Sequence, residues 1–188
     1  MSVSSAIVSI GLIELNSIAR GIETSDAMLK AGEVTLVFAK PVCPGKFIVM
    51  VHGDVGAVKA AMAAGLEVGG ASVVNKLTIP RVHPTLIPAI NAVLDPPRQV
   101  AALGVVEYFD IASAIVGADA AAKTARITLI EARLGMGIGG KSFFKLCGEV
   151  ADVRSAVSAA VEIARDHSTL VNTCVIPAPD PSLFHEML

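Results

Sequence analysis

The order of apolar and polar positions in the first half of the chain predicts strand, helix, strand, strand, helix and strand. Runs of β-branched and apolar residues bounded by turn residues predict strands at about 6–15, 34–39, 47–51 and 72–79. Asn16 and Ser17 are good N-cap residues for a first helix, and Asp54 is one for a second. Pro80 ends the last strand.

Both helices carry apolar residues at helical spacing. The first places Ile18, Ile22, Ser25 and Leu29 on one face, and the second does so with Val55, Val58, Met62 and Leu66. A matching helix in the second half carries Val150, Val153, Val157, Val161 and Ala164. Such stripes are typical of a helix packed on a core, so we expect these residues to be buried rather than to bind a cofactor.

The second half of the chain repeats the first. The sequence GLIE at 11–14 returns as GVVE at 104–107, and the lysine at position 30 returns at 123, both 93 positions later. The pair GK at 45–46 returns at 140–141, 95 positions later, and VN at 74–75 returns at 171–172, 97 positions later. The second copy therefore holds two small insertions, which we expect in loops.

Paired prolines at 96–97 mark the joint between the copies, because proline stops a helix. We therefore predict two domains, 1–95 and 96–188. Each is expected to place two helices on one face of a four-stranded antiparallel sheet. This is an α+β, ferredoxin-like (βαββαβ) sandwich, present twice in tandem.

Composition narrows the class of protein. Hydrophobic residues make up 53% and mean hydropathy is +0.67, yet no apolar run reaches the roughly 18 residues of a membrane span. No signal peptide is evident, so we expect a cytoplasmic protein, and the excess apolar surface predicts an oligomer. A net charge of −2, no basic run and no tryptophan argue against nucleic acid or a membrane as partner.

One motif is misleading. The sequence GMGIGGKS at 135–142 fits the phosphate-binding pattern G-x-x-x-x-G-K-[ST], which requires a helix after the lysine. Here Lys141 aligns with Lys46 at the start of a strand, so we expect a strand and no nucleotide site. We find no Ser/His/Asp group or carboxylate pair that suggests catalysis, and the equivalence of Glu14 and Glu107 follows from duplication. We therefore predict that the protein is not an enzyme.

Several short blocks identify a resemblance to a known family. They are GLIEL at 11–15, DAMLK at 26–30, PGKF at 44–47, GDVGAV at 53–58 and IPRVHP at 79–84. Together these blocks resemble the bacterial microcompartment domain, in both copies and over nearly the whole chain. Each copy begins at the family's usual first strand, so the chain looks like the unpermuted tandem class of shell protein.

The resemblance implies a structural role. Tandem members of the family form homotrimers shaped like hexagonal tiles, which pack edge to edge with other shell proteins around enzymes. It implies that Lys30, Lys123 and Arg81 lie at tile edges, whereas the second copy has Pro177-Ala178 in place of the arginine. An ordinary solvated helix end remains the alternative for both lysines. The place of such a protein is the shell of a microcompartment in the cytoplasm, and encapsulated redox enzymes are possible further partners.

The resemblance also implies a central pore lined by loops from both copies. The loop residues are Pro41, Val42, Cys43, Pro44 and Gly45 in the first copy, and Gly137, Ile138 and Gly139 in the second.

Cys43 is the candidate metal ligand. Flanking prolines stiffen its loop, Gly45 permits a tight turn, and nearby Lys40 and Lys46 would favour the thiolate. One cysteine cannot hold an iron–sulfur cluster, but a three-fold axis brings three copies together. The chain most resembles the iron–sulfur-carrying tandem shell proteins of propanediol-utilisation microcompartments. That resemblance implies one [4Fe-4S] cluster per trimer, bound by Cys43 and serving electron transfer or closure of the pore.

Two alternatives stay open. One is a metal-free tandem shell protein whose pore passes small metabolites, and the other is a ferredoxin-like regulatory module that binds a small ligand. The position equivalent to Cys43 in the second copy is Ile138, so a trimer has three thiols in these loops. We expect the other cysteines, Cys147 and Cys174, to be buried small hydrophobes. The four histidines share no ligand spacing.

Overall fold

The computed structural model describes residues 9–94, 99–165 and 169–186 and divides into two compact units, 1–82 and 83–188. The elements of the first unit are β1 (Ser9–Leu15), α1 (Ile18–Ala31), β2 (Thr35–Val42), β3 (Lys46–Gly53), α2 (Val55–Gly69), a 3-10 turn (Gly70–Ser72) and β4 (Val73–Ile79). Those of the second are α3 (Leu86–Ile90), β5 (Ala102–Tyr108), α4 (Ile111–Thr124), β6 (Ile127–Leu134), β7 (Ser142–Gly148), α5 (Val150–Arg165), β8 (Leu170–Pro177) and α6 (Pro181–Glu186).

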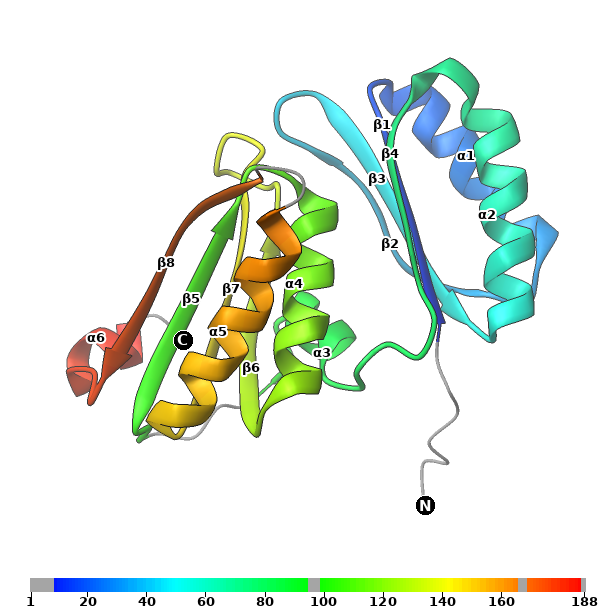
Figure 1. Cartoon of the computed structure of the whole chain (residues 1–188). Helices are drawn as coiled ribbons and strands as arrows, with labels where there is room; N and C mark the ends of the chain where they lie inside the picture. Colours follow the sequence, from blue (N-terminus) through cyan, green and yellow to red (C-terminus); the bar gives the residue numbers. More distant parts are fainter. Residues whose placement is uncertain (1–8, 95–98, 166–168, 187–188) are drawn as a thin grey trace. The chain divides into compact units, whose positions relative to one another are not determined.

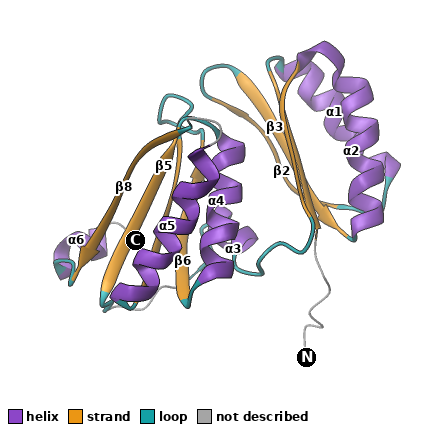
Figure 2. Cartoon of the chain, viewed as in Figure 1, coloured by secondary structure: helices purple, strands orange, loops and turns teal. Residues whose placement is uncertain are grey.

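Each unit contains one four-stranded antiparallel sheet. The strand order is β2-β3-β1-β4 in the first unit and β6-β7-β5-β8 in the second. Helices α1 and α2 cover one face of the first sheet, and α4 and α5 cover one face of the second (Figures 1 and 2). The predicted fold class, two tandem α+β sandwiches with βαββαβ order, is confirmed.

The repeat extends to irregular features of the strands. The pairing of β1 with β4 shifts register after Glu14, and that of β5 with β8 shifts after Glu107, the equivalent position. The sequence-predicted N-caps are confirmed as well. Ser17 Oγ accepts the N–H of Arg20 and Asp54 Oδ1 accepts the N–H of Ala57. These bonds satisfy N–H groups that a helix leaves free in its first turn.

The core of the first unit lies between the sheet and its two helices. From the sheet it contains Ile13, Leu15, Phe47, Val49 and Val51, and from the helices Met28, Val58, Ala61 and Met62. Val58 and Met62 were predicted to be buried, but Val55 is half exposed. In α5 of the second unit Val153 and Val157 are buried as expected, whereas Ala164 lies outside the described side chains.

The predicted core face of α1 is wrong for its three large apolar residues. Ile18, Ile22 and Leu29 are exposed, whereas Ser25 is buried as predicted, together with Gly21, Thr24 and Met28. A Cβ on Gly21 would lie 2.3 Å from the ring of Phe47, so the helix approaches the sheet closely along its small residues. Apolar periodicity therefore located a face of α1 that its own unit does not cover.

The second unit achieves the same packing with different side chains. Leu15 and Thr24 of the first unit correspond to Tyr108 and Gly117 of the second, 93 positions later. Tyr108 is fully buried, and its hydroxyl donates to the carbonyl oxygen of Ala160 at 2.8 Å. A Cβ on Gly117 would lie 2.1 Å from that hydroxyl, so the larger aromatic residue requires the glycine beside it.

The sequence did not predict the two short helices that follow the last strand of each copy. α3 packs against β6 and α4 of the second unit, and α6 buries Phe184 in a cluster with Leu103, Ile130 and Cys147. The division between the units falls at Val82/His83, and the expected joint at 95–98 lies outside the described residues.

Candidate functional site

The loop between β2 and β3 holds Cys43 in a tight turn. The N–H of Gly45 donates to the carbonyl oxygen of Val42 at 3.0 Å, which closes the turn. Gly45 has a φ of +84°, a value that favours glycine. The Cys43 thiol is free and partly exposed, and Pro44 beside it is exposed. The turn therefore presents one thiol toward its surroundings, as its sequence predicts.

The lysines near this loop are placed differently from each other. Lys46 Nζ forms an ion pair with Glu14 Oε1 at 2.7 Å, and the Glu14 side chain is only 3% exposed. Lys40 Nζ lies 4.9 Å from the ring centroid of Phe38, and burial lowers the pKa of the Lys40 amine. The charge of Lys46 is thus engaged by a buried carboxylate, which weakens the expected effect of Lys46 on the thiol.

The same ion pair recurs in the second unit, where Lys141 Nζ lies 2.7 Å from Glu107 Oε1. Sequence reasoning assigned the two glutamates to duplication alone and missed their partners. The sequence contained a signal for these ion pairs, because both the glutamate and the lysine occur at equivalent positions in the two copies. On both sheets the carboxylate holds a lysine at the start of the paired strand: Lys46 is the first residue of β3, and Lys141 comes directly before β7. The pair therefore fixes one end of each candidate pore loop.

The loop between β6 and β7 is longer and rich in glycine. Gly135, Gly137, Gly139 and Gly140 all have positive φ, between 66° and 85°. The N–H of Gly135 donates to the carbonyl oxygen of Lys141, which closes the loop. β7 begins at Ser142, so the predicted strand after Lys141 is confirmed, and the helix that a phosphate-binding loop requires does not follow that lysine.

No cluster of three or more His, Cys, Asp or Glu side chains that could hold a metal ion occurs among the described residues. A metal centre at Cys43 would draw its further donors from other copies of the chain. The thiol fits such a role, because it is accessible and its turn is closed by a backbone hydrogen bond. Thiolates are the usual protein ligands of iron–sulfur clusters.

The remaining cysteines differ from each other. Cys147 is buried as predicted, and burial raises the pKa of its thiol to about 11. Cys174 is exposed, so the expectation that it is buried was wrong. It lies on β8, an edge strand of its sheet, where alternate side chains are exposed.

The three candidate tile-edge residues have unlike surroundings. Lys30 is 74% exposed and pairs with exposed Asp26 at 2.6 Å. Lys123 pairs with Asp119, a buried carboxylate that also accepts the N–H of His83 at 2.7 Å. Desolvation lowers the pKa of the His83 imidazole, and the charge of Asp119 partly opposes this effect. The two lysines predicted as equivalent are therefore equivalent in sequence but not in environment.

Arg81, the third of them, is exposed and has a φ of +56°. Ala178, its counterpart in the second unit, has a φ of +46°. The backbone turn thus repeats after both β4 and β8, although the arginine does not.

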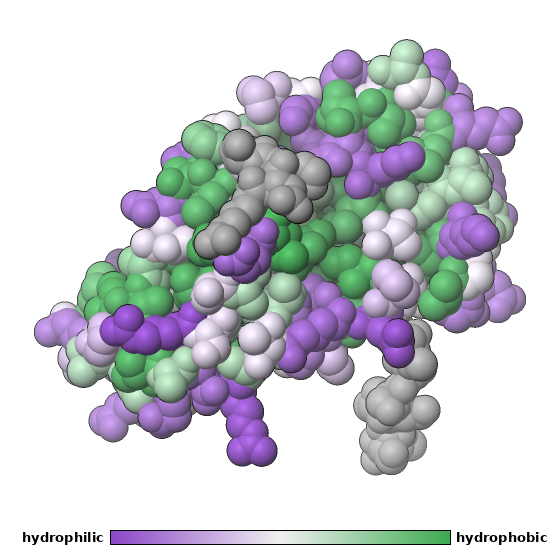
Figure 3. All heavy atoms as spheres, viewed as in Figure 1, coloured by the Kyte–Doolittle hydropathy of each residue, from purple (hydrophilic) through white to green (hydrophobic). Residues whose placement is uncertain are grey.

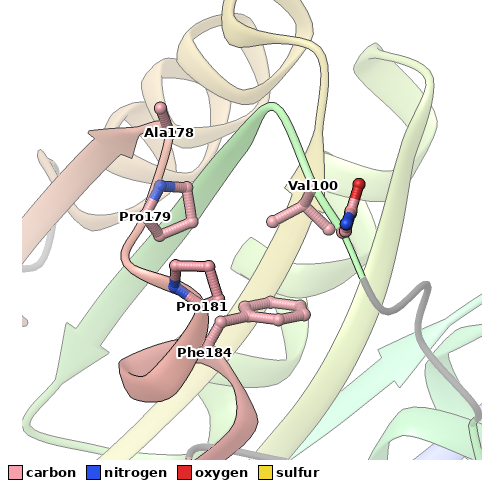
Figure 4. A pocket seen from close by; sticks show the side chains of 6 residues that line it. Val100, Ala178, Pro179, Pro181 and Phe184 are labelled. Atoms are coloured by element: carbon pink, nitrogen blue, oxygen red, sulfur yellow. The ribbon is translucent and has the colours of Figure 1, made fainter.

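A pocket of about 340 Å³ lies in the second unit beside α6. Its walls come from Gln99, Val100, Ala178, Pro179, Pro181 and Phe184 (Figure 4). The lining is mainly apolar, and Gln99 supplies its one polar side chain. Such a wall offers no acid, base or nucleophile, so it supports no catalytic chemistry.

Apolar side chains also remain on the surface of the chain, where green areas lie among hydrophilic ones (Figure 3). The large exposed members include Ile18, Ile22, Leu29, Leu36, Val55 and Leu183. In the described part of the chain, no helix combines the length and hydrophobicity that crossing a membrane would require.

Comparison with known proteins matches the BMC domain family twice, at residues 9–82 and 102–179. The bacterial microcompartment shell protein PduT of Citrobacter freundii is 41% identical over 179 residues, which cover 95% of this chain and 97% of that protein. The carboxysome shell protein CcmK2 of Thermosynechococcus vestitus is 37% identical over 83 residues, covering 42% of this chain and 81% of its own.

Similar solved structures are also microcompartment proteins. A microcompartments protein from Desulfitobacterium hafniense DCB superposes with a TM-score of 0.91 at 52% identity, covering 96% of this chain and 99% of that one. The fused permuted hexameric shell protein MSM0275 from the RMM microcompartment gives a TM-score of 0.61 at 26% identity, over 83% and 80% of the two chains. The chain belongs to the bacterial microcompartment domain family, and it is a structural shell protein with two such domains in tandem rather than an enzyme.

Proposed function

We propose that the protein forms a homotrimeric tile of a microcompartment shell, whose central pore binds one [4Fe-4S] cluster through three copies of Cys43. The observation that carries the proposal is the free, partly exposed thiol at the tip of the β2–β3 hairpin. The second unit has Ile138 at the equivalent place, so a three-fold assembly offers three thiols in this loop rather than six.

Three thiolates at an axis would leave the fourth iron of a cubane without a protein thiolate, and a small molecule or solvent can occupy that position. When bound, the cluster would supply a one-electron carrier within the shell. The residues of this chain would hold it: the Gly45 turn presents the thiol, and the pair between Glu14 and Lys46 anchors the adjacent strand.

The proposal is tested by anaerobic purification with iron and sulfide analysis. We expect a trimer of three 19.3-kDa chains, about four irons per trimer and a broad absorbance near 400 nm. Cys43→Ser should lose iron, whereas Cys174→Ser, which removes another exposed thiol, should retain it. Full iron content in the Cys43 variant refutes the cluster. An iron-free wild-type trimer supports the metabolite pore instead.

Lys30 provides a separate test of the tile edge. Its amine is largely exposed, and its partner Asp26 is exposed too, so replacement should not disturb folding. Lys30→Ala should leave the trimer intact but reduce the formation of extended sheets, measured by electron microscopy. Sheets of unchanged extent would exclude Lys30 from the edge contact.

A further inference from the structure

The first unit exposes apolar side chains at positions that the second unit buries. Ile18, Ile22 and Leu29 on α1, and Leu36 on β2, are between 39% and 59% exposed, and we call these four the α1–β2 patch. Their counterparts 93 positions later are at most 8% exposed: Ile111, Ile115, Ala122 and Leu129. Because the elements repeat while burial does not, the second unit must carry a cover that the first lacks.

α3 is positioned to be that cover. It follows β4 in the chain and packs against β6 and α4, the two elements that carry the buried counterparts. Leu86 and Ala89 of α3 are fully buried. Just before the helix, the N–H of His83 donates to Asp119 Oδ1 on α4 at 2.7 Å, which fixes the approach of the segment.

The segment after β8 repeats the segment after β4. Both begin with Ile-Pro, both contain a residue with positive φ at the next position, and Leu86 corresponds to Leu183 at a distance of 97 residues. The burial of these two leucines is opposite, because Leu86 is fully buried and Leu183 is 45% exposed. Phe184, the next residue, is buried in the core of its own unit and keeps α6 in place.

Each chain thus leaves the α1–β2 patch of its first unit uncovered. It also exposes Leu183 on α6, the helix equivalent to the covering helix α3. We propose that α6 of one copy covers the α1–β2 patch of the next copy through Leu183, as α3 covers the corresponding surface of the second unit. Asp26 completes the parallel. Its Oδ2 binds Lys30 as Asp119 binds Lys123, and no bond to its Oδ1 is found in the described part of the chain.

Asp26 Oδ1 then accepts the N–H of Asp180 from the neighbouring copy, since Asp180 corresponds to His83. Every copy gives one α6 and receives one, so the contact is head to tail and can close into a ring. The inference rests on the proposed homotrimer and names the surfaces that hold it together.

Two charge substitutions test the contact. Ile22→Asp and Leu183→Asp alter exposed side chains, so both variants should fold, as checked by circular dichroism. Each buries a carboxylate at the proposed interface and should weaken association at least about tenfold, measured by mass in solution. Val55→Asp changes an equally exposed apolar residue outside the patch and should remain trimeric. Trimers of unchanged stability in both interface variants would overturn the inference.

Cross-linking gives a test that does not depend on stability. One chain carries Ile22→Cys and a differently tagged chain carries Leu183→Cys, both with Cys43 and Cys174 replaced by serine. After co-expression and mild oxidation we expect a mixed disulfide-linked pair. A wild-type trimer without this cross-link refutes only the docking contact. A wild-type monomer refutes the trimer of the proposed function itself.

Discussion

Gly117→Ala should disrupt the second unit by forcing an atom into space that Tyr108 occupies. The added Cβ would lie 2.1 Å from the hydroxyl oxygen and 2.8 Å from Cζ, whereas ordinary contacts begin near 3.4 Å. The ring cannot easily retreat, because it is fully buried, lies 6.2 Å from the ring of Phe144 and is hydrogen-bonded to Ala160. Overpacking of this kind costs about 1–3 kcal/mol, and we expect a value near the upper end.

A double-mutant cycle isolates the cause. Tyr108→Phe removes the hydroxyl oxygen and its hydrogen bond, at a cost of about 1 kcal/mol. In that background the nearest remaining contact is at 2.8 Å, so Gly117→Ala should cost about 1 kcal/mol less than in the wild type. Gly56→Ala is the matched control, because that helical glycine has room for a methyl group and should gain up to about 1 kcal/mol.

Urea unfolding followed by circular dichroism, at one fixed protein concentration, measures the free energies of unfolding of the four proteins in the cycle and of Gly56→Ala. Tyr108 is the single tyrosine of a chain without tryptophan, so its fluorescence also reports on this site in variants that retain it. The reasoning is refuted if Gly117→Ala is as stable as the wild type. It is also refuted if its cost is the same with phenylalanine at position 108.

Two further predictions follow from the ion pairs and the cysteines. Lys46→Ala should lower the free energy of unfolding by about 2 kcal/mol, because it leaves the Glu14 carboxylate, which is 3% exposed, without its ion-pair partner. Lys141→Ala should cost about 1 kcal/mol or less, because Glu107 is 32% exposed; equal losses in urea titrations would contradict this. Of the three thiols in cluster-free protein, Cys147 alone should resist a thiol reagent at pH 8, since its pKa is raised to about 11 and it is buried. Rapid labelling of Cys147 in mass spectrometry of the folded chain would show that this site is open.

The predicted elements agree well with the observed ones because their signals are local. Ser17 and Asp54 begin helices by bonding backbone N–H groups a few residues away, and Pro80 follows the end of β4. Because of the repeat, each element could be predicted from two copies of its sequence. The alignment of Lys141 with Lys46 therefore predicted a strand after Lys141 despite the phosphate-loop pattern, and a strand is observed there. The short helices α3 and α6 gave no comparable signal, since five or six residues contain too little periodicity.

The candidate site was predicted in part. The turn at Gly45 and the position of Cys43 in it could be inferred, because glycine and proline constrain the backbone locally. The partner of Lys46 could not be inferred, since Glu14 is 32 residues away and lies on a strand that pairs with β3. Ion pairs between strands depend on register, which emerges only when the sheet forms.

The sequence by itself determined the duplication, the order of strands and helices, the family blocks and the single cysteine in the first loop. These features depend on residue identity and short-range spacing. Only the tertiary structure decided which apolar residues are buried. Ile22 and Ile115 occupy equivalent helical positions and are the same residue type, yet one is 59% exposed and the other is 0% exposed. Burial depends on what packs against a side chain, and here the second unit carries α3 over a surface that the first unit leaves open.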